Sequence, residues 1–121
     1  MAEITSFEKA CSAVKILDSK KAKNIELLKV EGLTILADYF IICSADSSTL
    51  VRALADTLED EFDKKDIKLF SREGKDGLNW LLMDYGDVIV HIFYQESREF
   101  YSLEKLWSDA ESIDIEKIIN E

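Results

Sequence analysis

The most regular hydrophobic pattern in the chain runs from Gly77 to Tyr94, with the sequence GLNWLLMDYGDVIVHIFY. Apolar, β-branched and aromatic residues fill two runs, and Gly86 and Asp87 separate them. Such a pattern predicts two antiparallel strands joined by a two-residue turn, whose first central position has a positive φ that glycine tolerates. A turn centred on Tyr85 and Gly86 is less favourable, because it would force a bulky residue to a positive φ.

The two faces of this predicted hairpin differ in character. Strand side chains alternate between the faces, and either two-residue turn preserves that alternation, whereas a turn longer by one residue would exchange the faces. One face is uniformly apolar and suits a core, and it carries Leu81, Met83, Val88, Val90 and Ile92. The other face is mixed, and it carries Trp80, Leu82, Asp84, Ile89, His91 and Phe93. The pattern leaves open whether this mixed face is a recognition surface or a second buried layer.

The N-terminal part of the chain predicts a helix and then a strand. Thr5 and Glu8 have the spacing of a capping box, and apolar residues follow them at helical intervals, so we predict a helix that ends near Asp18. Residues 25–30 alternate imperfectly and predict a strand, which a Glu-Gly pair closes. Residues 33–38 are ambiguous and receive no element.

The middle of the chain predicts a central strand and a long helix. The continuous apolar run YFIIC at residues 39–43 is typical of a strand covered on both faces. Ser47 or Ser48 can cap the helix that follows, whose apolar stripe extends to Phe62. We predict another strand at residues 67–70, and because a strand–helix–strand crossover makes its two strands parallel, the sheet should be mixed.

The remaining segments complete the predicted fold. A charged loop is expected at residues 72–76, short helices that cover the sheet at 96–101 and 103–107, and a last helix capped by Asp114. Together the elements predict an α/β fold: a mixed, mostly five-stranded sheet with helices packed on it. We expect a single domain over residues 1–110 and a helical or flexible C-terminal tail over residues 111–121.

Composition narrows the classes of partner and compartment. The chain has 121 residues and a net charge of −10, which disfavours direct nucleic-acid binding because that binding depends on lysine and arginine contacts to phosphates. An acidic surface would instead attract a basic protein. The apolar runs are too short for a membrane span and the N-terminus lacks the pattern of a signal peptide, so we expect a cytoplasmic protein with no membrane contact.

Cys11 and Cys43 are widely spaced among apolar neighbours, and we expect reduced thiols.

The sequence contains few groupings typical of a catalytic or cofactor site. It has no glycine-rich phosphate loop and no paired cysteine spacing, so we expect no cofactor. His91 lies between two apolar residues and favours a structural role in a sheet. Asp84 and Asp87 could hold a magnesium ion, but aspartate is also favoured in turns for its local hydrogen bonds. Residues 44–49 could receive an anion at the start of the following helix, although ordinary capping by a serine is the simpler interpretation.

Several segments in order resemble one known family. The segments are ADYFIICS at residues 37–44, VRA and AD at residues 51–56, REG at 72–74, WLLMDYGDVIVHIF at 80–93 and REFYSLEKLW at 98–107. They resemble the ribosomal silencing factor family, also called Iojap-like, over most of residues 37–110. Three positions depart from the family pattern. Ala45 replaces a common glycine, Leu50 replaces a polar residue, and Met83 replaces a leucine, which conserves volume.

The resemblance implies a function that composition alone does not. Members of this family bind the large ribosomal subunit through its ribosomal protein fourteen, block docking of the small subunit and so repress translation when nutrients are limiting. The family has a fold related to nucleotidyltransferases, has no established catalytic activity and often forms homodimers. A large-subunit ribosomal protein would also match the acidic charge, since such proteins are commonly basic.

The face assignment and the family motifs together predict a partner-binding patch. The alternation of faces motivates Trp80, Leu82 and Asp84, and the family motifs alone motivate Asp38, Phe40 and Tyr85. Trp80 would be the buried anchor and Asp84 the partner of a lysine or arginine. Two alternatives stay open: a magnesium-dependent nucleotidyltransferase-like enzyme that uses Asp84 and Asp87, and a pure dimerisation module in which Trp80 packs against a second copy.

Overall fold

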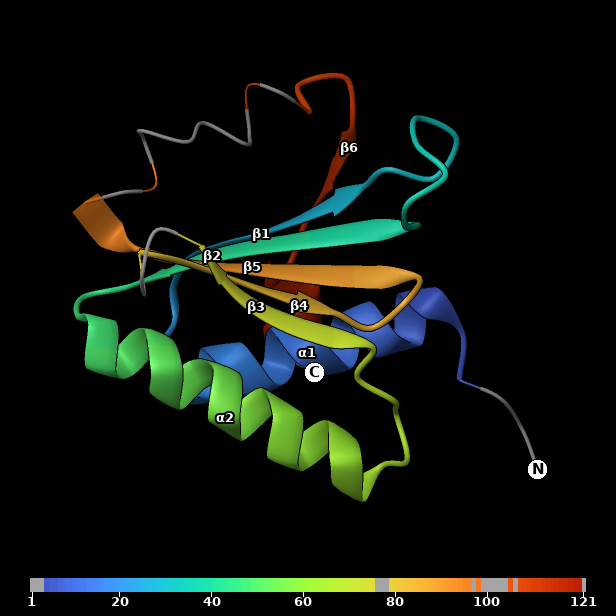
Figure 1. The fold of residues 1–121 in the computed structure, drawn as a ribbon. Helices are drawn as coiled ribbons and strands as arrows, with labels where there is room; N and C mark the ends of the chain where they lie inside the picture. Colours follow the sequence, from blue (N-terminus) through green and yellow to red (C-terminus); the bar gives the residue numbers. More distant parts are fainter. Residues whose placement is uncertain (1–3, 76–78, 97, 99–104, 106, 121) are drawn as a thin grey trace.

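The computed structural model describes residues 4–75, 79–96, 98, 105 and 107–120, and within them it shows a mixed sheet with helices on one face (Figure 1). The strands are β1 (Lys23–Lys29), β2 (Tyr39–Ala45), β3 (Ser71–Lys75), β4 (Trp80–Asp84), β5 (Val88–Tyr94) and β6 (Glu111–Ile113). The helices are α1 (Ser6–Ser19), α2 (Ser48–Lys64) and α5 (Glu116–Ile119). The predicted α/β class with a mixed sheet is confirmed, and the sheet has six strands in the order β3-β4-β5-β2-β1-β6 rather than five.

The two central strands, β2 and β5, run parallel and are the most buried part of the sheet. Their register pairs Tyr39 with Val88 and continues to Ala45 with Tyr94. All seven residues of β2 are buried. The continuous apolar run therefore forms a central strand, as predicted, because both faces of β2 are covered by other parts of the chain.

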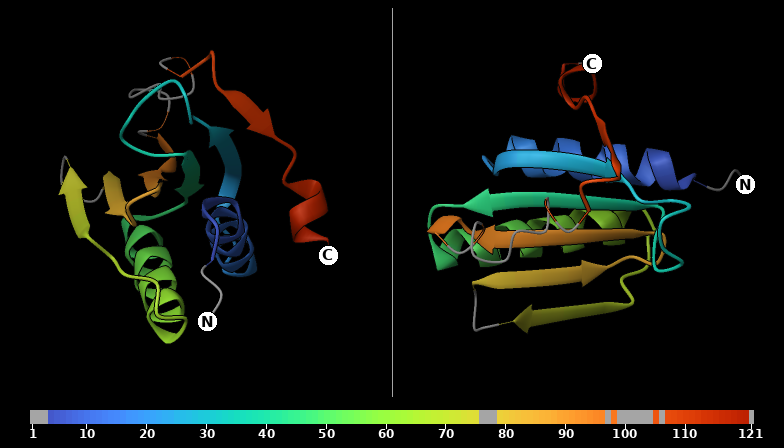
Figure 2. Two further views of the ribbon diagram at one scale, coloured as in Figure 1. Left: turned by 90° about the vertical axis from the view of Figure 1, so that its right-hand side faces the viewer. Right: turned by 90° about the horizontal axis from the view of Figure 1, so that it is seen from above.

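The predicted hairpin and the partition of its side chains are confirmed. The Tyr85 N–H donates to the Val88 carbonyl at 2.9 Å, and Gly86 between them has a φ of +90°. The uniformly apolar face packs against α1, α2 and α5 in the main core, and those three helices lie on the same side of the sheet in the left view of Figure 2. The mixed face contributes to a second, smaller core on the opposite side.

Both long helices begin where the sequence predicts. The Thr5 hydroxyl accepts from the Glu8 N–H at 3.1 Å and the Glu8 carboxylate accepts from the Thr5 N–H at 3.2 Å, which is the complete capping box of α1. Ser47 caps α2, because its hydroxyl accepts from the Leu50 N–H at 3.1 Å. These caps satisfy backbone donors that the first turn of a helix leaves unpaired.

The predicted strand at residues 67–70 and the predicted loop at 72–76 are both wrong. The Ile67 N–H donates to the Phe62 carbonyl at 2.9 Å and thus still belongs to the end of α2. The strand begins only at Ser71 and pairs antiparallel with β4. It lies at the edge of the sheet, where charged side chains are favoured because they discourage pairing with other chains, so its composition resembles that of a loop. By the observed pairings β3 has the direction of β2 but is not its neighbour.

The C-terminal residues add to the sheet and to the helical layer. Strand β6 pairs antiparallel with β1, with Leu27 opposite Ile113. The α5 residue Ile118 is buried in the main core, and Asp114 accepts from the Glu116 N–H at 3.0 Å. The short helices predicted at 96–101 and 103–107 fall mostly on residues outside those that the structure describes. The domain boundary at residue 110 stays a prediction.

The two cysteines are free thiols, as expected. Cys43 is completely buried in β2, and burial raises the pKa of its thiol to about 12 because the thiolate would lose its hydration. Cys11 lies on α1 and is partly buried.

Candidate protein-binding surface

The mixed face of the hairpin is largely a second buried layer. A small apolar cluster forms there from side chains of β1, β2 and β5 and the loop after β1, namely Leu28, Val30, Ala37, Phe40, Ile42, Ile89 and Phe93. Trp80 and Leu82 pack against this cluster and remain half-buried. The structure thus resolves the alternative left by the sequence: β5 contributes buried residues to this face, and β4 contributes the partly exposed ones.

Trp80 is held in one orientation by two neighbours on β5. Its ring stacks on that of Phe93, with centroids 5.2 Å apart and an interplanar angle of 26°. Its indole Nε1–H donates to Nδ1 of His91 at 3.2 Å. An aromatic side chain fixed in this way loses little conformational freedom on binding, which suits an interface anchor.

His91 is a neutral, buried histidine. Burial lowers the pKa of His91 to about 4, because the imidazolium would be desolvated. Since Nδ1 accepts from Trp80, the proton resides on Nε2, and that atom is buried with no hydrogen-bond partner among the described residues. The ring also meets the edge of Phe40, with centroids 5.1 Å apart. These contacts agree with the structural role predicted for this residue.

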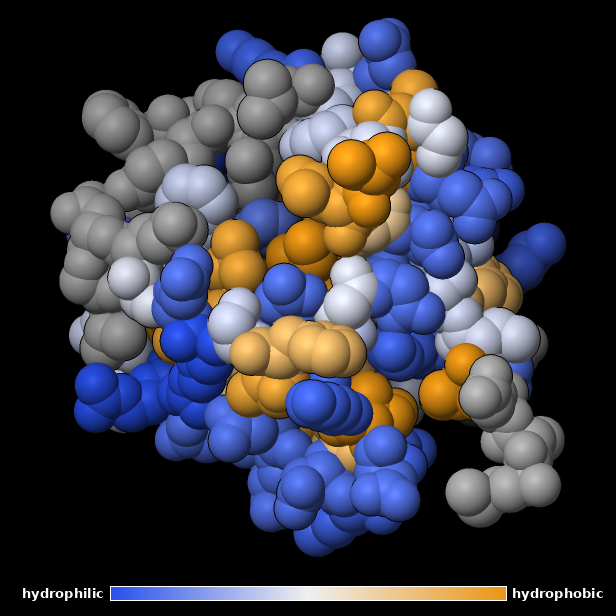
Figure 3. Space-filling view, turned by 45° about the vertical axis from the view of Figure 1, so that its right-hand side comes forward, coloured by the Kyte–Doolittle hydropathy of each residue, from blue (hydrophilic) through white to orange (hydrophobic). Residues whose placement is uncertain are grey.

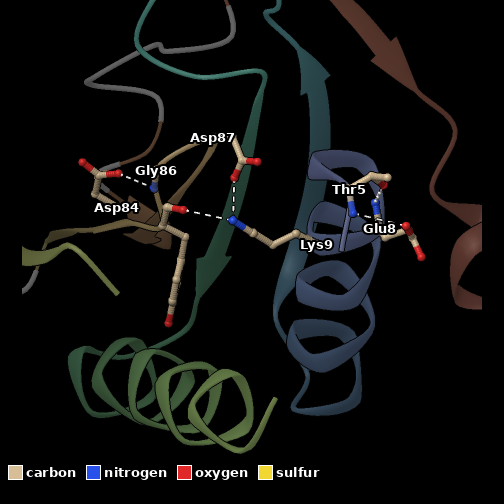
Figure 4. Close-up of polar contacts among 7 residues, drawn as sticks. Thr5, Glu8, Lys9, Asp84, Gly86 and Asp87 are labelled. Atoms are coloured by element: carbon tan, nitrogen blue, oxygen red, sulfur yellow. Dashed lines mark hydrogen bonds and ion pairs between the residues drawn. The ribbon is translucent and has the colours of Figure 1, made fainter. Parts of the chain in front are cut away.

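Asp84 and Asp87 serve the hairpin turn and its attachment to α1 (Figure 4). One carboxylate oxygen of Asp84 accepts from the Gly86 N–H at 2.7 Å, which is the local hydrogen bond expected of a turn aspartate. Asp87 forms an ion pair with Lys9 of α1 at 2.6 Å, and the same ammonium donates to the Tyr85 carbonyl at 3.2 Å. The Lys9 ammonium therefore lies beside the Asp87 carboxylate, where the magnesium hypothesis would require the metal ion to bind. Among the described residues, no three or more His, Cys, Asp or Glu side chains form a group suited to a metal ion.

The structure does not bring all six predicted patch residues to one surface. Tyr85 points into the main core, where its ring meets the edge of Phe62 with centroids 4.8 Å apart, and burial raises its pKa. Phe40 is also buried, beneath Trp107, with centroids 5.1 Å apart. Phe40 thus lies beneath the mixed face, whereas Tyr85 belongs to the core on the helix side of the sheet. The half-exposed members are Trp80, Leu82, Asp84 and Asp38.

Asp38 and Asp84 lie at the turn end of the sheet, next to an exposed loop. The Asp38 N–H donates to the Asp87 carbonyl at 2.8 Å, and this contact ties the loop before β2 to the hairpin turn. That loop exposes Leu33, Ile35 and Leu36. Sequence reasoning left these residues without a role. The available signal was three large aliphatic side chains in a segment with no helical or strand period, which has no obvious face to bury them.

Two hollows of the described surface are lined by other residues. One groove of about 880 Å³ runs between α2 and residues 66–72 and is lined mainly by acidic side chains, including Asp56, Glu59 and Asp63. A second of about 810 Å³ lies near Ser44 and Arg98. Neither of these two hollows is lined by Trp80, Leu82, Asp84 or Asp38. Within the described residues, no helix is long and apolar enough to cross a membrane.

Comparison with known proteins places this geometry in one family. The family model described as "Ribosomal silencing factor during starvation" (RsfS) matches residues 3–121. A ribosomal silencing factor of Bacillus subtilis is 40% identical, over 90% of this chain and 92% of that protein. A mouse protein named "Mitochondrial assembly of ribosomal large subunit protein 1" is 34% identical over 78% of this chain, and the match spans 43% of that longer protein.

Solved structures agree with the sequence comparison. A crystal structure of a Chromobacterium violaceum protein superposes with a TM-score of 0.83 at 30% identity, covering 87% of this chain and 88% of that one. A Bacillus halodurans structure gives a TM-score of 0.74 at 35% identity, covering 84% and 92%. The match extends over almost the whole chain and includes both the sheet and the hairpin motif, so the chain belongs to the ribosomal silencing factor (RsfS) family.

Proposed function

We propose that this protein binds the large ribosomal subunit through its ribosomal protein fourteen and sterically prevents the small subunit from joining. Translation would be repressed in this way when nutrients are limiting, in the cytoplasm. The observation that carries the proposal is membership of the ribosomal silencing factor family over residues 3–121. The name of the mouse relative, which refers to assembly of the large ribosomal subunit, supports the choice of subunit.

The surface chemistry supports a protein partner with a basic contact area. Trp80 and Leu82 offer partly exposed apolar area, and Asp38 and Asp84 add carboxylates at the turn end. Buried aromatic anchors with charged residues around them are typical of protein interfaces. The net charge of −10 would draw the protein toward a basic ribosomal protein and away from bare RNA.

We propose that binding, without catalysis, is the activity. Asp84 and Asp87 are the carboxylates on which an enzymatic mechanism would depend, and each already has an intramolecular contact, with Gly86 and Lys9 respectively. The rival hypothesis of a magnesium-dependent nucleotidyltransferase-like enzyme predicts a metal-dependent rise in melting temperature and nucleotide turnover, both lost in Asp84→Asn. Absence of any effect of magnesium or nucleotide on the wild type would exclude that rival.

The test of the main proposal is sedimentation of the purified protein with isolated large and small subunits, followed by a subunit-joining assay. We expect wild-type protein to pellet with large subunits only and to reduce the yield of joined ribosomes. Asp38→Lys should weaken both effects, because it replaces a carboxylate of the patch by a positive charge that a basic partner would repel. The fold should be retained, because the Asp38 side chain has no hydrogen bond or ion pair among the described residues and the substitution leaves the backbone contacts intact. Asp63→Lys is the matched control, since it makes the same charge change on α2, on the opposite face of the sheet.

Trp80→Ala tests the anchor. It should lower affinity for large subunits, and it will also cost some stability because Trp80 packs on Phe93. Its melting temperature must therefore be measured beside its affinity. Wild-type affinity in a folded Trp80→Ala variant would show that the patch is misassigned. If light scattering instead shows that the wild type is a dimer and that only this substitution dissociates it, the dimerisation alternative is favoured.

A further inference from the structure

The turn end of the sheet exposes more large apolar area than any role in the fold explains. Ile35 is 103% exposed, Leu36 66%, Leu33 49% and Phe70 60%. We call these four residues the turn-end surface. Single exposed apolar residues are ordinary on a protein surface, but several large ones at the same end of a sheet are typical of an interaction site.

The loop that carries three of these residues is held in place at its base. The Val30 N–H and the Glu31 N–H both donate to the Asp38 carbonyl, at 2.8 and 3.0 Å, which closes the loop. At the tip, the Leu36 N–H donates to the Thr34 hydroxyl at 3.1 Å. A loop that is closed and braced in this way presents its side chains without a large ordering cost when a partner binds.

Phe70 joins the loop residues through the hairpin turn. Its ring lies against Gly86, so closely that a Cβ at Gly86 would come within 3.0 Å of the ring. The Phe70 N–H also donates to the Asp84 carbonyl at 2.8 Å. The loop is hydrogen-bonded to Asp87 on the other side of the same turn. Figure 3 shows apolar side chains gathered on this side of the molecule, interspersed with polar ones.

The charges around the turn-end surface select the kind of partner. Glu31, Asp38 and Asp84 lie beside it and form no ion pair among the described residues, whereas Asp87 is neutralised by Lys9. One cation, Lys68, lies over the Phe70 ring, with its Nζ 5.1 Å from the ring centre. Two copies facing each other through this surface would bring like charges together, and an RNA backbone would be repelled.

We propose that the turn-end surface docks into an apolar hollow, rimmed by lysine or arginine, on a protein of the large ribosomal subunit. The inference rests on the proposed function and extends it, because it assigns the contact to residues 33–36 and Phe70 in addition to the hairpin face. The aliphatic side chains supply the buried apolar area, and the surrounding carboxylates pair with the basic rim.

The experiment compares two variants with the wild type for sedimentation with isolated large subunits. The test variant carries Leu33→Ser, Ile35→Ser and Leu36→Ser. The control is Ile4→Ser, which removes one aliphatic side chain, 42% exposed, from the segment before α1. Thermal melting and light scattering are recorded for each protein. Removing three exposed side chains should leave the melting temperature unchanged.

We expect the test variant to bind large subunits about tenfold or more weakly, since each tenfold corresponds to about 1.4 kcal/mol of lost contact. The control should bind like the wild type. Equal binding by the test variant and the wild type would overturn this inference and leave the proposed function standing. No binding by the wild type would overturn both. A wild-type dimer that only the test variant dissociates would overturn the inference in favour of a second copy, and undiminished binding to protein-free ribosomal RNA would overturn it in favour of a nucleic-acid contact.

Discussion

At the scale of single residues, both long helices end on a residue other than glycine in the left-handed conformation. Lys21 after α1 has a φ of +70° and Asp66 after α2 a φ of +62°. In each case the two hydrogen bonds of a Schellman motif are present: for α1 they run from Ala22 to Leu17 and from Lys21 to Asp18. Residues with a Cβ are strained at such a φ, and glycine is the usual choice.

Lys21→Gly should therefore stabilise the protein. We expect the free energy of unfolding to rise by about 0.5–1 kcal/mol, because relief of the left-handed strain exceeds the extra chain entropy of glycine. Urea unfolding at pH 7 measures the change. Lys20→Gly is the control, since Lys20 has a φ of −105° and glycine offers no advantage there. A loss of stability in Lys21→Gly would contradict this account of the helix end.

His91 should make stability depend on pH in a defined window. Its folded pKa of about 4 lies below the ordinary value of 6.5, so between these values the unfolded chain binds more protons than the folded chain. The free energy of unfolding should thus be fully retained above pH 6.5 and fall as the pH is lowered toward 4. The loss due to this residue is on the order of 3 kcal/mol, from about 1.4 kcal/mol per pKa unit.

The measurement is urea unfolding at pH 7 and pH 4.5 for the wild type and for His91→Gln, whose amide can still accept from Trp80. Carboxylates titrate in both proteins, so their contribution cancels when the two losses of unfolding free energy are compared. The wild type should lose more stability than the variant between the two pH values. Equal losses would mean that His91 is not buried in its neutral form in the folded protein.

At the scale of elements, the hairpin turn depends on Gly86 for two reasons. Its φ of +90° disfavours any other residue, and a Cβ would meet the Phe70 ring at 3.0 Å. Gly32 shares the first constraint with a φ of +87°, but a Cβ there meets nothing within 4 Å. Substituting the two glycines in turn therefore distinguishes the cost of backbone strain from the cost of a steric contact.

Gly32→Ala should lower the free energy of unfolding by about 1 kcal/mol through strain alone. Gly86→Ala should lower it further, because the Phe70 ring must also move. Thermal or urea unfolding of both variants tests the order. Equal effects of the two substitutions would show that the Phe70 ring adapts to the added methyl group without cost.

The C-terminal elements should contribute to stability through Ile118. This α5 residue is only 7% exposed and packs in the main core with residues of α1. Ile118→Ala should lower the free energy of unfolding by about 2 kcal/mol or more, through lost burial and the cavity left behind. Urea unfolding measures it, with the exposed Glu116→Ala as control. No loss would indicate that residues 111–121 behave as a flexible tail, which is one of the two alternatives that the sequence left open.

At the scale of the whole molecule, the net charge of −10 should govern how fast the protein meets its partner. Attraction between an acidic protein and a basic contact area is screened by salt, with a Debye length of about 10 Å at 0.1 M. The association rate with large subunits should therefore fall several-fold between about 50 and 200 mM salt, while the dissociation rate changes less. Stopped-flow fluorescence with labelled protein measures both rates. An association rate that rises with salt would mean that the contact is made against phosphate.

Local pattern was sufficient for much of this fold. The capping box at Thr5, the serine cap at Ser47 and the glycine turn at Gly86 are decided by hydrogen bonds and dihedral preferences within a few residues. Alternation of side chains likewise predicted both faces of the hairpin. The family resemblance, carried by contiguous motifs, indicated the family to which the comparisons show that the chain belongs.

Only the tertiary structure decided features that depend on distant segments. A strand with the sequence SREGK is compatible with a sheet because it lies at the edge, and the pairing of Ser71 with Asp84 joins parts of the chain that no local pattern connects. Tyr85 and Phe40 belong to family motifs, yet packing buries both. The exposure of Ile35 and Phe70 has the same origin: whether an apolar side chain is covered depends on what the rest of the chain places over it, and no local period encodes that.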